Sequence, residues 1–381
     1  MATSKATQTA KTRRARKRAA EVLFAPAAVT RLEAKATLPA RFQRMLARLP
    51  MKRVCGGGTV AVKVHVGWGI GFTTIPPLFI RLLVEKIKAA GAKKVFVTDG
   101  SPTVEAATAR GYTAEVLGAP VLGAAGVNDT FCYEHKVRYK TLRSINVAGN
   151  IEDADALVNL SHFKGHGDCG YGGACKNLAM GCVTQETRGH LHQLEGGLTY
   201  DEGLCIKCRK CVEACVRGAA RWNEEQNRLE IFYHHCVYCR HCVLACPKGA
   251  ITITGGGFVP FQRGLALATK EVLGTFDSGR VLHINFLTQI TVYCDCWGFS
   301  TPALIPDVGI LASEDIVAID NASLDLTRDG RPLPGSLPPS HELVEGNHMF
   351  ERIHGKDPYI QIEQMANVGL GTPAYRLQKV N

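Results

Sequence analysis

The chain has 381 residues, of which 46% are hydrophobic and 21% are charged, and these proportions exclude a wholly disordered protein. A chain of this length predicts about two to three domains with sizeable cores. No segment reaches about 18 uncharged apolar residues, so we expect no transmembrane helix. Fifteen cysteines and a formal net charge of +11 are the unusual features.

The excess positive charge lies largely at the amino terminus. Residues 1–20 contain seven basic side chains and no acidic one, and the rest of the chain has 38 basic and 34 acidic residues. We therefore predict a basic disordered tail over residues 1–30. Arg13 and Arg14 do not indicate an export signal, because charged residues interrupt the apolar segment that such a signal needs. Nucleic-acid binding by this tail is an alternative, and it would be strongly salt dependent.

Strand-like and helix-like segments alternate from residue 55 onward. Residues 60–66 alternate valine with other residues, which predicts a strand that places Lys63 and His65 on one face. A helix is expected after Pro76 and Pro77, because proline is favoured in a first helical turn. Further strands are expected over 94–98, 156–160 and 281–286, and helices over 103–110, 174–180 and 313–326, the last capped by Ser313. This alternation predicts an α/β fold, a mostly parallel sheet covered by helices.

One segment interrupts the alternation. Residues 195–255 contain two cysteine blocks and have glycines at both ends. We therefore predict an inserted domain over 195–255, with the α/β domain formed by residues 31–194 and 256–381.

The two cysteine blocks have the spacing C-x2-C-x2-C-x3-C, and a proline follows the second block. This is the spacing of bacterial ferredoxins that hold two [4Fe–4S] clusters, in which the fourth cysteine of each block binds the other cluster. The predicted ligands are Cys205, Cys208, Cys211 and Cys246 for one cluster, and Cys236, Cys239, Cys242 and Cys215 for the other. Zinc sites or disulfides are the alternatives, but matched blocks fit a ferredoxin better. Thiolate ligands also indicate a reducing, cytoplasmic compartment.

A second informative stretch is HFKGHGDCGYGGACKNLAMGC, residues 162–182. It follows an expected strand and leads into an expected helix. Gly170, Gly172 and Gly173 let the backbone approach a ligand closely, and the N–H groups of a helix start favour an anion. The alternative is that these glycines only permit tight packing. The stretch matches neither a Walker A loop nor a dinucleotide-binding fingerprint.

Several single residues are candidates for chemistry, each with a simpler structural alternative. Lys176 lies in the first turn of the expected helix, where the dipole disfavours a cation unless an anion or cofactor is near. Asp99 lies at the carboxyl end of a strand, where open α/β sheets bind ligands. Cys294 and Cys296 are two residues apart, so extended backbone would place both side chains on one side. They could be soft metal ligands, a redox thiol pair or part of the lining of a cofactor site. The catalytic candidates are Lys176, His166, Asp99 and His65, and the cofactor-binding candidates are Lys63, Gly170, Gly172, Gly173, Cys294 and Cys296.

The stretch 162–182, the later CDCWGFSTPALIPDVGILASEDIVAID and the double ferredoxin motif together resemble the domain-of-unknown-function family numbered 362. The resemblance covers residues 55–380 and implies an α/β domain with a ferredoxin-type insertion, without a settled reaction. More distantly, the segment with His166, Gly170, Gly173 and Lys176 is similar to the one by which nickel-dependent lactate racemase holds its cofactor. That similarity implies a cofactor-tethering role for Lys176 and proton transfer for His166.

We therefore predict an iron–sulfur oxidoreductase in which two [4Fe–4S] clusters relay electrons to a substrate or to a further organic or metal cofactor in the α/β domain. One alternative is a ferredoxin-like electron carrier that docks a partner protein. Another is a racemase-like enzyme with a lysine-tethered cofactor and structural clusters. The expected partner is a redox protein or a small-molecule substrate, with no membrane and no nucleic acid.

Overall fold

The computed structural model describes residues 19–104, 106–194, 197–215, 218–232, 236, 241–254, 258–339 and 341–380. The tail through residue 18, the ligand candidate Cys239 and the glycines 255–257 lie outside the described residues. None of the described helices is long and apolar enough to cross a membrane.

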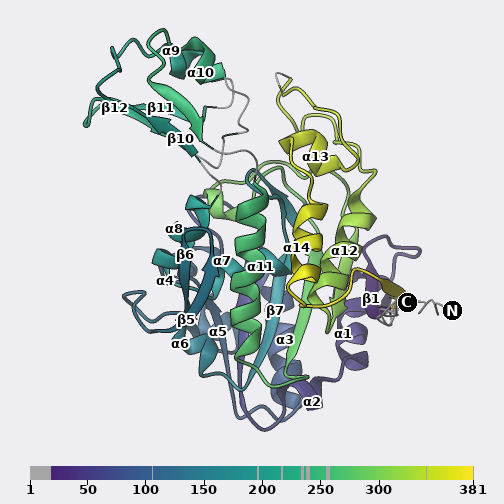
Figure 1. Cartoon of the computed structure of the whole chain (residues 1–381). Coiled ribbons are helices and arrows are strands. Elements are labelled where there is room, and N and C mark those ends of the chain that lie inside the picture. Colours follow the sequence, from purple (N-terminus) through teal and green to yellow (C-terminus); the bar gives the residue numbers. More distant parts are fainter. Residues whose placement is uncertain are drawn as a thin grey trace, which may run out of the picture.

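An eight-stranded sheet forms the centre of the molecule (Figure 1). Its order is β16 (Tyr375–Lys379), β1 (Ala20–Pro26), β15 (Gly309–Ser313), β14 (Val281–Leu287), β7 (Ala156–His162), β2 (Thr59–Val64), β3 (Lys94–Asp99) and β4 (Val121–Gly123). The five strands from β14 to β4 run parallel, β15 is antiparallel to both its neighbours, and β1 and β16 are parallel to each other. The predicted α/β class with a mostly parallel sheet is confirmed.

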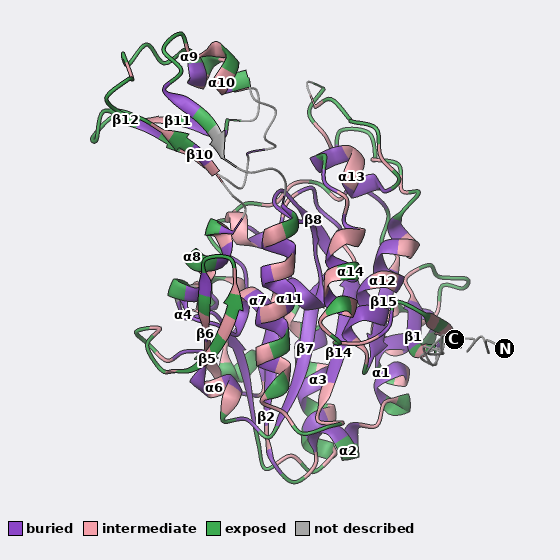
Figure 2. Ribbon diagram, in the orientation of Figure 1, coloured by how far each residue is buried: buried purple, intermediate pink, exposed green. Residues whose placement is uncertain are grey.

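Both faces of the sheet are buried (Figure 2). One face packs on α1 (Leu38–Arg48), α2 (Met51–Cys55), α3 (Pro77–Ala89) and α5 (Ala114–Leu117). The other packs on α7 (Ala174–Gly181), α8 (Gln185–Gln193), α11 (Val259–Gly274), α12 (Ile316–Thr327), α13 (Met349–His354) and α14 (Tyr359–Asn367). The valines of β2 at 60, 62 and 64 enter the first core, so Lys63 projects from the opposite face.

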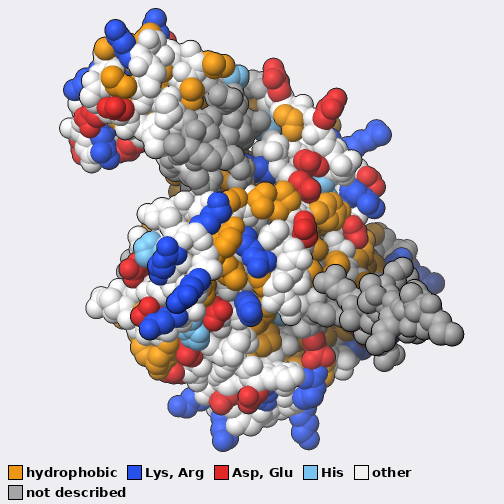
Figure 3. Space-filling model, viewed as in Figure 1, with side chains coloured by type: hydrophobic (Ala, Val, Ile, Leu, Met, Phe, Trp, Pro, Cys, Tyr) orange, Lys and Arg blue, Asp and Glu red, His pale blue; other side chains and the backbone are white. Residues whose placement is uncertain are grey.

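Smaller elements complete the α/β body. They are the 3-10 turns Ala34–Ala36, Thr108–Arg110 and Asp295–Trp297, the helices α4 (Ser101–Val104) and α6 (Gly149–Glu152), and the hairpins β5–β6 (Cys132–Tyr139, Leu142–Ala148) and β8–β9 (Lys164–His166, Gly170–Gly172). Basic and acidic side chains are interspersed on the face shown in Figure 3, so this face is neither uniformly positive nor uniformly negative.

Three local predictions are wrong. The tail does not extend to residue 30, because β1 is hydrogen-bonded between β15 and β16 and buries Val22 and Ala25. The helix expected over 103–110 is two separate turns, α4 and Thr108–Arg110. Helix α12 is capped by Asp315 instead of Ser313, since the Asp315 carboxylate accepts hydrogen bonds from the N–H groups of Val317 and Ala318.

The order of strands reverses between β7 and β2. From β2 the chain moves outward through β3 to β4, whereas β7 and then β14 lie on the other side of β2. In open α/β sheets, ligands bind beyond the carboxyl ends of the strands at such a reversal. The fold therefore places a candidate site where β2, β3, β7 and β14 end.

A separate small module follows α8. Strand β10 (Gly197–Tyr200) pairs with β13 (Ile251–Thr254), and β11 (Ala220–Asn223) pairs with β12 (Arg228–Ile231). Short helices α9 (Lys210–Glu213) and α10 (His241–Ala245) lie within the two halves, and Figure 1 shows the module beyond the upper end of α11. Its small core includes three of the cysteines, Cys211, Cys236 and Cys242.

Candidate functional site

A cavity of about 610 Å³ opens at the carboxyl edge of the sheet. Most of the sequence candidates line this cavity, and they come from the ends of β2, β3 and β9, from the start of α7 and from the 3-10 turn Asp295–Trp297. They are Lys63, His65, Asp99, Gly172, Gly173, Lys176, Cys294 and Cys296. His166 is fully buried next to this cavity, against Cys296. Gly170 does not line the cavity; a side chain there would meet Lys356 and Pro358, so close packing explains this glycine.

Asp99 organises one side of the cavity. Its carboxylate lies 2.9 Å from Lys63 Nζ and 2.7 Å from His65 Nδ1, and it also accepts hydrogen bonds from Thr103 Oγ1 and the backbone N–H of Val66. Burial would raise the pKa of Asp99, but Lys63 and His65 outweigh this effect and hold the pKa well below its usual range. The ionised carboxylate fixes the proton of His65 on Nδ1. His65 Nε2 is buried without a hydrogen-bond partner among the described residues.

Asp295 organises the other side. Its carboxylate lies 2.7 Å from His162 Nδ1 and 3.3 Å from Lys164 Nζ, and it accepts a hydrogen bond from Thr73 Oγ1. Burial would raise the pKa of Asp295, yet His162 and Lys164 outweigh it and keep the carboxyl ionised. This network fixes the backbone between Cys294 and Cys296.

Lys176 faces the two thiols. Its Nζ lies 3.6 Å from Cys294 Sγ and 3.7 Å from Cys296 Sγ. Burial would raise the pKa of Cys294, but a hydrogen bond from Cys296 and the charges of Lys164 and Lys176 lower it well below its usual range. The same hydrogen bond, together with burial, raises the pKa of Cys296. These opposite shifts favour the thiolate on Cys294 and the thiol on Cys296.

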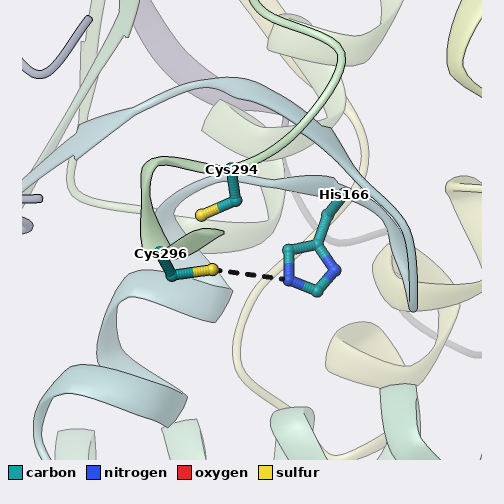
Figure 4. A group of neighbouring side chains, drawn as sticks. All are labelled: His166, Cys294 and Cys296. Atoms are coloured by element: carbon teal, nitrogen blue, oxygen red, sulfur yellow. Dashed lines mark hydrogen bonds between the residues drawn. The ribbon is translucent and has the colours of Figure 1, made fainter. Parts of the chain in front are cut away.

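His166, Cys294 and Cys296 form a group of three donors (Figure 4). Their donor atoms all lie within 4.8 Å of one another, which is close enough for a single metal ion. His166 Nε2 lies 4.0 Å from Cys296 Sγ, and His166 Nδ1 accepts a hydrogen bond of 3.1 Å from the N–H of Asp168.

The glycine-rich turn forms the β8–β9 hairpin and the start of α7. A Cβ at Gly165 would lie 2.2 Å from the carbonyl oxygen of Val292, so this glycine permits the hairpin to approach the segment before the cysteines. The expected anion at the helix start belongs to the protein itself. Asp320 accepts hydrogen bonds from the N–H groups of Ala174 and Cys175 at 2.8 and 3.0 Å.

Cysteines of the module converge from the two blocks. Cys205, Cys208, Cys211 and Cys246 line one cavity. Several sulfurs accept backbone N–H hydrogen bonds: Cys205 from Lys207, Cys215 from Ala219 and Ala220, and Cys246 from Ala250, at 3.2 to 3.3 Å. Cys236 and Cys242 are buried in the module core.

The module contacts the body next to the cysteine pair. The Phe232 ring, in the module, lies 5.6 Å from the Trp297 ring in an edge-on arrangement, and Trp297 stacks on Tyr293 at 4.2 Å. Lys356 Nζ donates a hydrogen bond of 3.3 Å to the carbonyl oxygen of Cys236 and also contacts the carbonyl oxygen of Gly167. The second cysteine block thus adjoins the glycine-rich turn.

Sequence reasoning missed several residues of the site, among them Lys164, Asp295 and Asn177, and also Arg188 and His192 of α8, which line the cavity. Lys164 and Asp295 lie inside motifs that the sequence singled out, between or beside the chosen residues. Asn177 accepts a hydrogen bond of 2.7 Å from Lys63 and follows Lys176 directly. The position of Lys164, Asp295 and Asn177 within these motifs was the one sequence feature that could have indicated them. Only the fold shows that Lys164 and Asn177 line the cavity and that Asp295 lies in the adjoining hydrogen-bond network.

The fold and the cavity define an α/β protein with a cysteine-rich module and a basic, thiol-lined site at the switch point of its sheet. The chain belongs to the family described as Domain of unknown function (DUF362), whose family model matches residues 60–325. This confirms the resemblance drawn from the sequence.

One solved structure is a distant neighbour, that of the lactate racemase apoprotein from Thermoanaerobacterium thermosaccharolyticum. The identity is 11% and the TM-score 0.35, with 71% of this chain and 51% of that chain covered. The chain therefore spans about half the length of this racemase. No curated protein matches the chain.

Proposed function

We propose that the protein is an iron–sulfur oxidoreductase, in which the module holds two [4Fe–4S] clusters and the cavity binds the molecule that is oxidised or reduced. The observation that carries the proposal is the convergence of Cys205, Cys208 and Cys211 with Cys246 of the other block around one cavity. This is the crossed ligand set expected of a two-cluster ferredoxin.

Two features of the module fit such clusters. Backbone N–H groups that point at cysteine sulfurs stabilise thiolates and tune the potential of a cluster. The module core is also very small and is partly made of cysteine, and a domain of about 60 residues is only marginally stable, so bound metal would add substantially to its folding free energy. The described cysteines are all free of disulfides.

When bound, the clusters supply one-electron reduction and oxidation. Residues of the chain provide the connection to the cavity. Phe232 contacts Trp297, and Trp297 directly follows Cys296 at the cavity wall. Among the described residues, this aromatic contact connects the module with the cavity wall.

The cavity residues have distinct roles in this proposal. Lys63 keeps Asp99 ionised, and Asp99 holds His65 with its proton on Nδ1. His65 Nε2 is then a bare acceptor at the cavity, placed to take a proton from a substrate while electrons leave it. Lys164 and Lys176 give the cavity positive charge, which favours an anionic group on the substrate.

His65 also supports a second candidate function. Proton transfer without net oxidation, as in a racemase, would use the same Asp99–His65 pair, with clusters that only stabilise the module and a further cofactor held at Lys176. A pure electron carrier is the third possibility, and it would not need a cavity histidine whose Nε2 has no hydrogen-bond partner among the described residues.

The test is anaerobic purification with quantification of iron, sulfide and other metals. We expect about eight iron atoms and eight sulfides per chain, and a reduced protein with two interacting paramagnetic centres. Cys208→Ser should lower the iron content by up to about half, because it removes a ligand of one cluster. Cys55→Ser, a buried cysteine remote from the module, is the matched control and should keep all the iron.

Zinc in place of iron, or full iron content in the Cys208→Ser protein, would overturn the cluster assignment. Bleaching of cluster absorption on addition of a substrate would distinguish the oxidoreductase from the racemase-like enzyme. Mass spectrometry of small molecules released from the purified protein would reveal a further cofactor.

A further inference from the structure

We propose that Cys294 and Cys296 are a redox-active thiol pair that exchanges two electrons with the module by opening and closing a disulfide. The proposal rests on the proposed function for its one-electron partners, and it adds a two-electron centre at the wall of the cavity.

The geometry of the pair supports this role. Cys294 and Cys296 flank a single residue, their sulfurs lie within 4.8 Å of each other, and both line the cavity. Cys294 has extended backbone and Asp295 begins a 3-10 turn, so the two side chains converge across a bend. A disulfide between residues so close in sequence closes a small ring, and strained disulfides are the easily reduced ones.

Charge around the pair favours the open form. Lys176 Nζ lies within 3.7 Å of both sulfurs, so its ammonium stabilises whichever sulfur is ionised. The carboxylate of Asp295 contacts His162 and Lys164, and the positive charge of Lys164 offsets its repulsion of a neighbouring thiolate.

The same contacts disfavour a metal ion at this place. His166 Nδ1 accepts the N–H of Asp168, so the neutral imidazole carries its hydrogen on Nε2, the atom that faces Cys296 (Figure 4). A metal-bound histidine instead uses a bare nitrogen and donates with the other one. In addition, the Lys176 ammonium already places a cation beside both sulfurs.

The iron–sulfur centres of the module would supply and accept the two electrons of disulfide reduction and oxidation. On reduction, the sulfur–sulfur bond breaks, two electrons arrive one at a time from reduced iron–sulfur centres, and one proton from solvent binds Cys296, leaving Cys294 as thiolate. On oxidation, the bond forms, two electrons return one at a time to oxidised iron–sulfur centres, and the proton goes back to solvent. Trp297, in edge contact with Phe232, joins the two centres.

The test uses anaerobic protein whose iron is counted in every sample. The protein is equilibrated with mixtures of reduced and oxidised dithiothreitol, its thiols are trapped with N-ethylmaleimide, and the peptide with residues 294 and 296 is weighed. We expect two adducts under reducing conditions, and under oxidising conditions no adduct and a peptide two hydrogens lighter. Cys294→Ser and Cys296→Ser should each abolish this change, while Cys55→Ser should retain it.

The link to the module is tested with a reduced ferredoxin, a protein too large to enter the cavity. It should open the disulfide in wild-type protein, about tenfold or more slowly in Trp297→Leu, and at near wild-type rate in Trp297→Phe, which keeps a ring. Equal rates in all three would overturn the assigned link.

Two adducts at every dithiothreitol ratio would overturn the thiol-pair proposal. So would one further metal ion per chain that is lost in both His166→Ala and Cys294→Ser, because it would show a metal site. Protein that contains no iron, but whose pair still cycles with dithiothreitol, would overturn the proposed function and support the thiol pair, so the two failures are distinguishable.

Discussion

Asp99 Oδ2 and His65 Nδ1 lie 2.7 Å apart, and Lys63 Nζ binds the other carboxylate oxygen at 2.9 Å. Lys63 lies near the end of β2, and His65 directly follows the last residue of this strand. Both side chains reach the carboxylate at the end of β3. Lys63 and Asp99 are almost completely buried, so the charge of each depends on the other.

The first prediction concerns the stability of this triad. Asp99→Asn should lower the free energy of unfolding by about 3–5 kcal/mol, because it leaves the Lys63 ammonium buried without a counter-charge. The double variant Lys63→Met with Asp99→Asn should recover part of this loss. Urea unfolding of the single and double variants measures both values, and strictly additive losses would contradict the coupling.

The second prediction concerns pH. Burial lowers the pKa of His283 to about 3 and that of His348 to about 4, so both stay neutral in the folded protein while the unfolded chain protonates near pH 6.5. The unfolded state then binds more protons, and stability falls as pH decreases below about 6.5. Each histidine should contribute about 1.4 kcal/mol per pH unit until its folded pKa is reached.

Urea unfolding at a series of pH values measures this slope. His283→Gln should reduce the slope between about pH 6 and 4, because glutamine does not titrate. A slope that does not change would show that His283 is protonated in the folded protein. Below about pH 4 the ionised Asp99 and Asp295 add a further loss, since their stabilisation disappears as the pH falls through their lowered pKa values.

The third prediction concerns Lys176. Lys176→Met should slow the alkylation of Cys294 at neutral pH by about tenfold or more, because the thiolate loses a cation 3.6 Å from its sulfur. Lys176→Arg should keep most of the reactivity, since it retains the charge. Rates of iodoacetamide labelling, followed peptide by peptide with the partly exposed Cys132 as internal reference, test this expectation. Equal rates in the Met and Arg variants would mean that Lys176 does not stabilise the thiolate.

The fourth prediction concerns the start of α7. A Cβ at Gly173 would lie 2.6 Å from Asp320 Oδ1, which accepts the N–H of Ala174, while Oδ2 of the same carboxylate accepts the N–H of Cys175. Gly173→Ala should therefore destabilise the protein by about 2 kcal/mol or more. Gly189→Ala in α8 is the matched control, because a Cβ there meets nothing within 4 Å and alanine favours a helix by up to about 1 kcal/mol. Thermal unfolding compares the two, and equal stabilities would refute the steric argument.

The fifth prediction concerns iron removal. A chelator under oxidising conditions should expose residues 197–254 to limited proteolysis while the α/β body resists, because cysteines make up much of the module core. Peptide mapping of the digest locates the cuts. Cleavage that starts within the body, or a module that resists without iron, would contradict a metal-dependent module.

The sequence alone determined the class of the fold and the candidates that belong to short local patterns. Alternating valines in β2 predict both the strand and the shared face of Lys63 and His65, because side-chain direction follows the two-residue period of extended backbone. Cysteine spacing predicts the paired blocks in the same way.

Only the tertiary structure decided what these candidates contact. Asp320 binds the start of α7, where the sequence predicted an external anion. Strand β1 belongs to the sheet because β15 and β16, at the other end of the chain, supply its hydrogen bonds. Lys176 meets Cys294 across 118 positions. Such pairs depend on strand order and on the reversal between β2 and β7, which local periodicity does not encode.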